Sequence, residues 1–296
     1  MKVLLIVNPV AGKRKVESKL KEILALLEEN GYRIELYFTK GERDAEAVAA
    51  QRASEKDVVI CCGGDGTLSE VANGMLGLSE RPPLAYIPAG STNDFARSMG
   101  FSSDIMKAVQ DIVQGERKAI DIGRLADRYF MYVASFGAFT QTSYDTPIGL
   151  KNLLGHFAYI LEGVKELKNL KPYKIKVEAA DGKIYEDEYI FGAISNSTSI
   201  GGLIHLSDKL VDYQDGLLEV MLIRYPKHLG DMEKILTSLH KGSFDEEFIT
   251  FFHSPRVSLY SEEPLAWSLD GECAQANCDL TIEVLKQGIE LVFPKK

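Results

Sequence analysis

Residues 58–75 read VVICCGGDGTLSEVANGM and combine the signals of a strand, a turn and a helix. An apolar strand runs into a double-glycine turn, and a helix follows at once. This layout presents backbone N–H groups and the positive end of a helix to phosphate. Yet the residue at the tip of the turn is Asp65, an anion. If the turn binds phosphate, the aspartate therefore requires a cation beside it.

Strands and helices alternate on both sides of this stretch. Strands that are apolar throughout, separated by amphipathic segments, are typical of a parallel sheet covered on both faces. We therefore expect a three-layer α/β domain over residues 1–125 with a mostly parallel sheet. Its expected strands are KVLLIVN, RIELYF, DVVICC and LAYIP, its expected helices span residues 15–30, 43–54 and 67–77, and it ends near KAIDIGRL.

The second part of the chain, residues 126–296, alternates apolar and polar residues between Gly, Asp and Pro. This pattern predicts an antiparallel β-sandwich domain, with the extreme C-terminus as a candidate to return to the first domain. One long helical stretch, from about residue 150 to 170, interrupts it. The expected strands are YKIKVEA, YIFGAIS, LLEVMLI, RVSLY, LTIEV and IELVF.

Composition narrows the classes of function. The chain has 296 residues and a formal net charge of −9, which argues against nucleic-acid binding through a global basic surface. The N-terminal apolar run is too short for a signal peptide, and no stretch approaches the roughly 20 apolar residues of a membrane span. The sequence therefore predicts a cytoplasmic protein that binds no nucleic acid.

Acidic residues recur in two glycine-rich turns that follow strands and in the segment that ends the first domain. Asp65 lies in GGDGT, Asp94 in PAGSTNDFAR, and Asp121 in IDIG. In open α/β sheets, ligands bind beyond the carboxyl ends of the strands. Each aspartate alone is explained as a turn or helix-capping residue. Three together indicate Mg²⁺ between them and a phosphate, because this ion prefers oxygen ligands and neutralises both partners.

Five sequence elements together resemble the diacylglycerol kinase catalytic-domain family, in its soluble bacterial lipid kinase branch. GGDGT alone is shared with NAD kinases and, more distantly, phosphofructokinases. The full order of elements is far more specific, and it covers the whole chain. These elements are NPVAGK (8–13), GGDGTLSEVANGM (63–75), PAGSTNDFAR (88–97), DYQDGLLEV (212–220) and LDGE (269–272).

The resemblance implies ATP-dependent phosphoryl transfer to a lipid hydroxyl. Asp65, Asp94 and Asp121 would form the Mg²⁺–water network, and Glu272 would be the general base with Asp270 beside it. The residues alone place Glu272 in a turn between two strands, which agrees with the role of a general base. The alternative is that Glu272 lies in an ordinary solvated hairpin turn and has no catalytic role. The nucleotide site would be lined by Asn8, Gly12, Lys13, Thr39, Gly63, Gly64, Asp65, Gly66, Thr67, Leu68, Ser69, Thr92 and Arg97.

A second, structural Mg²⁺ is implied in the DG loop. Its ligands would be the Asp215 side chain and the backbone carbonyls of Asp212 and Leu217. The family commonly has a proline upstream of DG, and residues 206–216 lack one.

Diacylglycerol is the expected acceptor, with phosphatidic acid as the product, and phosphatidylglycerol and sphingoid lipids are alternatives. Two other functions remain open at this point: an NAD kinase-like enzyme with a soluble acceptor, and a non-catalytic nucleotide- or lipid-binding regulator. A homodimer is a further expectation.

The apolar stripe of residues 150–170 is explained by packing on a core or by contact with a membrane surface. The same region is rich in lysine, which favours transient association with anionic lipid. The lysines are Lys151, Lys165, Lys168, Lys171, Lys174 and Lys176.

Overall fold

The computed structural model describes residues 1–137, 170–200, 204–275 and 278–295. The chain forms two compact units. The first unit contains Met1–Ile122, Arg128–Met131 and Leu285–Lys296, and the second contains Gly123–Asp127 and Tyr132–Val284. The last residues of the chain thus belong to the first unit.

The first unit is built on a parallel sheet with the strand order β2-β1-β3-β4. The C-terminal end of β17 adds to β4 in parallel, with Leu291 opposite Leu84. The strands are β1 (Lys2–Val7), β2 (Arg33–Phe38), β3 (Val58–Gly63) and β4 (Leu84–Pro88), and the hairpin strands β5 (Glu116–Leu125) and β6 (Arg128–Phe130) follow.

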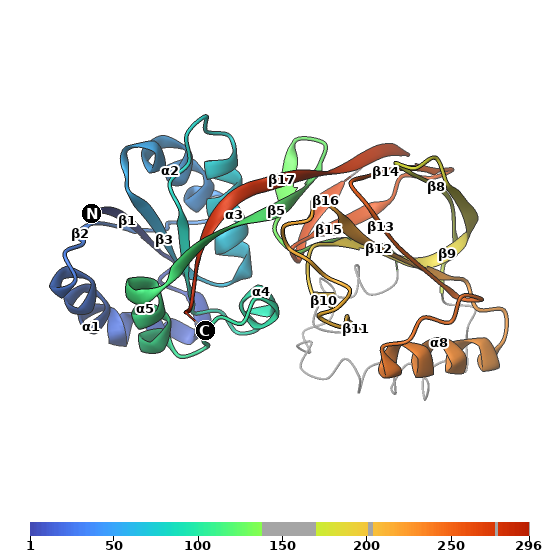
Figure 1. The fold of residues 1–296 in the computed structure, drawn as a ribbon, viewed down its shortest axis with the longest axis horizontal. Helices are drawn as coiled ribbons and strands as arrows, with labels where there is room; N and C mark the ends of the chain where they lie inside the picture. Colours follow the sequence, from blue (N-terminus) through green and yellow to red (C-terminus); the bar gives the residue numbers. More distant parts are fainter. Residues whose placement is uncertain (138–169, 201–203, 276–277, 296) are drawn as a thin grey trace. The chain divides into compact units, whose positions relative to one another are not determined.

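Helices cover both faces of this sheet (Figure 1). On one face, α1 and α5 contribute Ile23, Leu27 and Val109 to a core that also includes Leu5 and Ile60 from the strands. On the other face, α2 and α3 pack on each other. The helices are α1 (Lys15–Glu29), α2 (Asp44–Arg52), α3 (Asp65–Leu76), α4 (Asp94–Ser98) and α5 (Ile105–Gln114), with 3₁₀ turns η1 (Ala11–Arg14) and η2 (Ala53–Glu55).

The predicted three-layer α/β architecture is confirmed for this unit, with shifts at helix starts. Helix α3 begins at Asp65, two residues before the predicted start, because Gly64 takes the extended N-cap conformation and Asp65 is already helical. All six residues of β3 are buried, which explains why this strand reads as a continuous apolar run.

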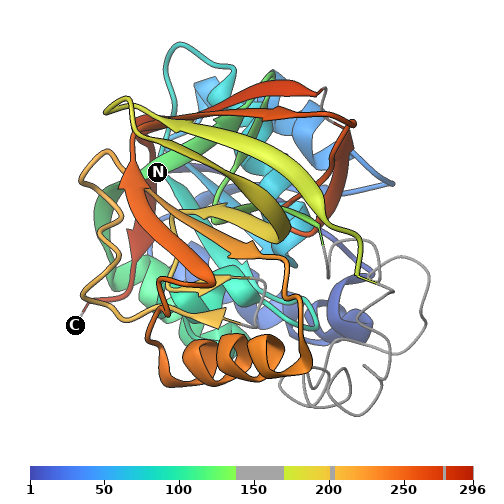
Figure 2. The same cartoon turned by 90° about the vertical axis from the view of Figure 1, so that its right-hand side faces the viewer.

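The second unit is an antiparallel β-sandwich-like domain, as predicted. Its long strand β9 pairs with β8 through its first half and with β7 and β12 through its second half. Figure 2 shows these strands with helix α8 lying outside them. The elements are β7 (Val133–Gly137), β8 (Tyr173–Ala179), β9 (Ile184–Ser195), β10 (Ser199–Ile200), β11 (Ile204–His205), β12 (Leu218–Arg224), α8 (Leu229–Lys241), β13 (Ile249–Ser254), β14 (Arg256–Ser261), β15 (Ala266–Leu269), β16 (Glu272–Gln275) and β17 (Asp279–Phe293).

One expectation for the strands is wrong. LTIEV and IELVF were expected as two strands but form the single strand β17. The polar residues between them make no turn: Gln287 has φ 50°, and the strand continues through Gly288. The predicted helical stretch of residues 150–170 lies outside the described residues, except for its last residue, Leu170, which precedes β8.

Candidate active site

Three glycine-rich turns meet at the carboxyl edge of the parallel sheet. A Cβ atom on Gly12 would lie 2.0 Å from the Ala89 carbonyl oxygen, and one on Gly90 would lie 2.7 Å from the Gly64 Cα. Only glycine permits such close approach of the backbones, and Gly12 also has a positive φ of 53°. The glycines predicted for the nucleotide site therefore join the turns after β1, β3 and β4 into one surface.

Asn8 fixes the first of these turns to the second. Its Nδ2 donates to the Thr67 hydroxyl at 3.0 Å, and its Oδ1 accepts from Val10 N–H at 3.1 Å. The backbone N–H of Asn8 continues the ladder to the Cys62 carbonyl at 2.9 Å. Asn8 and Thr67, both predicted site residues, are thus in direct contact.

Asp65 joins the second turn to the third. Its Oδ2 accepts a hydrogen bond of 2.8 Å from the backbone N–H of Asp94, the first residue of α4. Its Oδ1 is buried and has no hydrogen-bond partner within the described residues. Burial raises the pKa of Asp65 to about 6, and the negative charge of Asp94 adds to the increase, while hydrogen bonds from Asp94, Phe95 and Tyr86 oppose it.

Asp94 and Arg97 lie about one turn apart on the short helix α4. The Arg97 guanidinium is 3.6 Å from Asp94 Oδ1 and donates to the Thr92 carbonyl at 3.2 Å. Arg97 is exposed, while Asp94 is 9% exposed. The PAGSTNDFAR segment therefore holds a buried carboxylate beside Asp65 and an exposed cation on the same short helix.

Asp121 occupies a different environment in strand β5. It is fully buried, and its Oδ1 accepts a hydrogen bond of 2.6 Å from the backbone N–H of Gln287 in β17. Gln287 has a positive φ, so the aspartate satisfies a donor where the strand is irregular. The described contacts therefore bring Asp65 and Asp94 together and tie Asp121 to β17.

The other residues predicted for the nucleotide site differ in how far their side chains are exposed to solvent. Leu68 and Ser69 are buried in α3, and the Leu68 N–H donates to the Gly64 carbonyl at 3.0 Å. Thr39 follows β2, and its N–H donates to the Val7 carbonyl at 2.9 Å. Thr92 is exposed, whereas Gly63 is buried against the Thr67 side chain. Lys13 lies in η1, and its side chain is outside the described part.

The chemistry of this edge fits a phosphate bound through magnesium. Two neighbouring carboxylates supply the hard oxygen ligands that Mg²⁺ prefers, and Asp65 Oδ1 is a buried acceptor available to a metal or its water. The N-terminus of α3 and its glycine turn supply N–H groups for phosphate. Among the described residues, no group of three or more acidic, histidine or cysteine side chains is placed so as to hold a metal ion by itself.

In the second unit, Glu272 begins strand β16 after a two-residue turn. Asp270 and Gly271 form this turn with φ of 50° and 88°, as in the Asp-Gly hairpins of type I′. Asp270 is 4% exposed, and its Oδ1 accepts from Tyr132 N–H at 3.0 Å and Val133 N–H at 3.1 Å. Its carboxylate thus secures the hairpin, while Glu272, of intermediate exposure, occupies the first residue after it.

Further polar residues, which were not predicted from the sequence, lie on the strands beside this hairpin in the second unit. Glu219 lies opposite Ser195, and Ser195 lies opposite Val133, the strand residue that bonds Asp270. Glu219, Ser195 and Asn196 are at most 1% exposed. Buried polar side chains at strand ends are uncommon, and the polar run SNSTS after an apolar strand was the available signal.

The DG loop leads directly into β12, the strand that carries Glu219. Asp215 Oδ1 accepts from Leu217 N–H at 2.8 Å, and Asp212 Oδ1 accepts from Gln214 N–H at 3.0 Å. The N–H of Asp215 lies 3.5 Å from the Asp212 carbonyl, and Gly216 has φ of 84°. The three predicted ligand residues therefore lie in one tight turn whose aspartates already accept backbone hydrogen bonds.

Comparisons with known proteins show the family to which the chain belongs. Residues 2–125 match the family described as diacylglycerol kinase catalytic domain, and residues 146–293 match the YegS C-terminal NAD kinase beta sandwich-like domain. A diacylglycerol kinase of Bacillus subtilis is 34% identical over 90% of this chain and 88% of its own length. The chain belongs to the diacylglycerol kinase family. A diacylglycerol kinase of Staphylococcus haemolyticus is 32% identical over 98% of this chain and 88% of its own length.

Solved structures show the same fold for this diacylglycerol kinase family member. The crystal structure of a diacylglycerol kinase from Bacillus anthracis superimposes with a TM-score of 0.78 at 25% identity, covering 99% of this chain and 96% of that one. Another structure from that organism gives a TM-score of 0.84 at 28% identity, covering 99% and 95%.

Membership confirms the predicted enzyme class. The chain is an ATP-dependent kinase of the diacylglycerol kinase family that phosphorylates a lipid hydroxyl. The predicted family resemblance and the two-domain fold class are likewise confirmed. Among the described residues, no helix is long and apolar enough to span a membrane.

Proposed function

We propose that this kinase transfers the γ-phosphoryl group of ATP to diacylglycerol at a membrane surface, yielding phosphatidic acid. The observation that carries the proposal is the junction of the three glycine-rich turns, in which Asp65 bonds the backbone of Asp94. The relatives from Bacillus subtilis and Staphylococcus haemolyticus are both named diacylglycerol kinase, which supports this acceptor. Because diacylglycerol resides in bilayers, we expect the enzyme to act as a peripheral protein.

Residues 1–125 would bind the nucleotide. The turns that contain Asn8, Gly64 and Gly90 offer backbone N–H groups to the phosphates, as at other helix N-termini. Asp65 and Asp94 would hold Mg²⁺ directly or through water, and Asp121 would complete this network. When bound, Mg²⁺ neutralises charge on the transferred phosphoryl group.

Residues 126–296 would bind the acceptor. The lipid hydroxyl oxygen attacks the γ-phosphorus, its proton passes to the Glu272 carboxylate, and the bond from phosphorus to the ADP oxygen breaks. What supports this role is the place of Glu272 directly after a hairpin turn that is fixed by Asp270. We propose that Asp270 acts beside Glu272 by holding this turn.

The DG loop would bind a second, structural Mg²⁺. Asp215 and the carbonyls of Asp212 and Leu217 lie in one turn, which supports the assignment of these three ligands.

A lipid panel with labelled ATP tests the proposed function. Diacylglycerol, phosphatidylglycerol, sphingosine and the soluble acceptor NAD are each presented with the full chain and Mg²⁺. We expect label in phosphatidic acid and none in NADP. Label in NADP instead would overturn the assignment, and label in another lipid would correct the acceptor.

A further inference from the structure

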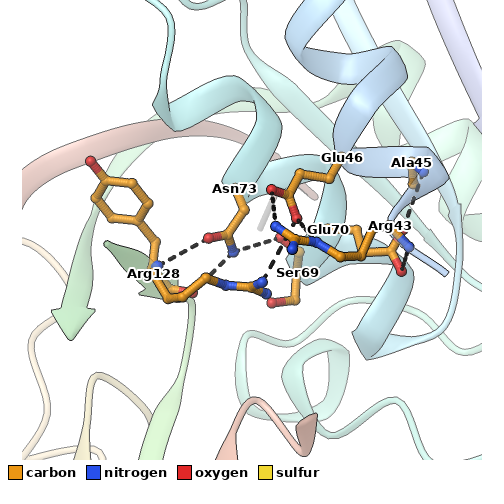
Figure 3. Close-up of polar contacts among 8 residues, drawn as sticks. Arg43, Ala45, Glu46, Ser69, Glu70, Asn73 and Arg128 are labelled. Carbon is orange, nitrogen blue, oxygen red and sulfur yellow. Dashed lines mark hydrogen bonds and ion pairs between the residues drawn. The ribbon is translucent and has the colours of Figure 1, made fainter. Parts of the chain in front are cut away.

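Helix α3 carries polar side chains on successive turns, and each one bonds the backbone of a different segment. Asp65 in the first turn bonds Asp94 in α4. Glu70 and Asn73, one and two turns further along the helix, are anchored in the same manner (Figure 3). The helix whose N-terminus forms the glycine turn is thereby connected to several neighbouring segments at once.

Glu70 caps the N-terminus of helix α2. Its Oε1 accepts from Arg43 N–H at 2.9 Å, and its Oε2 accepts from Ala45 N–H at 3.1 Å. Arg43, the N-cap residue, has φ of 61° and makes no side-chain capping hydrogen bond of its own. The first N–H groups of a helix need acceptors, and here a carboxylate from another helix supplies them.

This cap fixes the segment of residues 39–43, which follows β2 at the carboxyl edge of the sheet. At its start, Thr39 N–H bonds the Val7 carbonyl at 2.9 Å. At its end, Asp44 Oδ2 accepts from Lys40 N–H at 2.7 Å, and Glu70 holds Arg43. The segment that contains the proposed nucleotide residue Thr39 is therefore secured from both sides.

Asn73 holds strand β6 by pairing with both backbone groups of one residue. Its Oδ1 accepts from Tyr129 N–H at 3.0 Å, and its Nδ2 donates to the Tyr129 carbonyl at 3.0 Å and to the Ser69 carbonyl at 2.9 Å. Strand β6 pairs with β5, the strand of Asp121. The amide of Asn73 thus bonds the backbone of the β5–β6 hairpin, which carries the proposed site residue Asp121.

We propose that Glu70 and Asn73 are positioning residues for the nucleotide site. They couple the glycine turn at the start of α3 to the segment of residues 39–43 and to the β5–β6 hairpin. This inference rests on the proposed function insofar as ATP binds at the glycine turns. Neither side chain needs to touch the nucleotide, because displacing a site segment by an ångström is enough to weaken a productive geometry.

A purely structural role is the alternative, because α2 and α3 also pack tightly. A Cβ on Gly74 would lie 2.2 Å from the Glu46 carbonyl oxygen, and Val48 of α2 is buried. Val48→Ala therefore serves as a matched control, since it weakens the packing of α2 without touching the cap.

The experiment compares Glu70→Ala, Glu70→Gln, Asn73→Ala and Val48→Ala in the full chain. Equilibrium binding of ATP with Mg²⁺ is measured without acceptor, together with the KM values for ATP and diacylglycerol and the melting temperature. We expect ATP binding to weaken and its KM to rise about tenfold in Glu70→Ala, and less in Glu70→Gln, which keeps one acceptor. Asn73→Ala should weaken ATP binding, while the KM for diacylglycerol stays within roughly twofold in every variant.

Val48→Ala should lower the melting temperature and leave ATP binding unchanged. Unchanged ATP binding in both Glu70 variants and in Asn73→Ala would overturn the inference, as would equal weakening in Val48→Ala. The binding assay decides this independently of catalysis. If the unaltered chain binds ATP but phosphorylates no lipid, the proposed function fails while the positioning role is still measured.

Discussion

The carboxylate of Asp65 accepts a hydrogen bond of 2.8 Å from the backbone N–H of Asp94. This contact unites two glycine-rich turns that are separated by a whole helix and strand. A carboxylate at the N-terminus of a helix is favourable through the helix dipole, yet burial raises the pKa of Asp65 to about 6. Ionisation of Asp65 therefore lowers the stability of the folded protein at neutral pH, and a bound cation would remove this destabilisation.

The first prediction concerns Asp65→Asn. Between pH 4 and pH 6 the folded protein keeps a proton that the unfolded chain has released, so its stability falls as the pH rises through this window. Asparagine removes this ionisation, whose cost is on the order of 3 kcal/mol. Without divalent cations, we expect the melting temperature of the variant to be higher than that of the unaltered chain at pH 8. Below pH 4 the two melting temperatures should be the same. Its turnover should fall roughly 100-fold or more.

Thermal unfolding at several pH values and the lipid kinase assay check this prediction. Asp127→Asn, in the exposed turn between β5 and β6, is the control and should change neither measurement. A variant that is less stable than the unaltered chain at pH 8 would contradict the pKa argument, and normal turnover would contradict the magnesium role.

The second prediction concerns Glu272→Gln. A general base contributes about 10²–10⁴-fold, so turnover should fall within that range while ATP affinity changes little. The measurements are kcat with diacylglycerol and equilibrium binding of ATP. Glu262→Gln, an exposed glutamate paired with Lys174, is the control. If ATP binding collapses together with turnover, Glu272 has a structural or metal-binding role instead.

The third prediction separates Asp270 from its neighbour. Asn in place of Asp270 keeps an oxygen for the N–H groups of Tyr132 and Val133 and suits the positive φ of the turn. Asp270→Asn should therefore retain its melting temperature and most of its turnover, whereas Asp270→Ala should lose about 1–3 kcal/mol of stability. A stable but inactive Asp270→Asn would assign the charge of Asp270 to the chemistry.

Much of this site follows from local sequence, because parallel strands with glycine turns place those turns at one edge of the sheet. The strand before GGDGT and the meeting of Asp65 with the PAGSTNDFAR turn belong to this part. Other contacts join residues far apart in the chain: Asp121 bonds Gln287, 166 residues away, and Glu70 bonds Arg43, 27 residues away. Periodicity describes one segment at a time and does not identify such partners.

The fourth prediction tests the structural Mg²⁺ of the DG loop. Asp215 already accepts the Leu217 N–H, so removing the side chain would disturb the turn even without a metal. Asp215→Asn keeps an acceptor for this bond but removes the charge that Mg²⁺ requires. We expect Asp215→Asn to lose the rise in melting temperature that Mg²⁺ gives the unaltered chain and to need more Mg²⁺ for activity. If Asp215→Asn responds to Mg²⁺ as the unaltered chain does, Asp215 is only a turn residue.

The last prediction concerns the lysine-rich stretch expected to meet anionic lipid. Lys151, Lys165 and Lys168 lie outside the described residues, whereas the later lysines belong to or precede strand β8. There Lys171 lies 2.5 Å from Glu263, and Lys174 lies 3.5 Å from Glu262 and opposite Glu188. These neighbouring carboxylates offset much of the positive charge that the sequence places in this part of the stretch.

Two double charge reversals distinguish the halves of the stretch, since both change the net charge equally. Each lysine near an anionic bilayer contributes about 1 kcal/mol, and added salt screens this attraction. Lys165→Glu with Lys168→Glu should therefore weaken binding to phosphatidylglycerol-containing vesicles and raise the lipid concentration needed for activity. Lys171→Glu with Lys174→Glu should affect binding far less, because those charges are already paired. If neither salt nor either double reversal changes vesicle binding, the lysines do not contribute to it, and the protein contacts lipid through apolar residues alone.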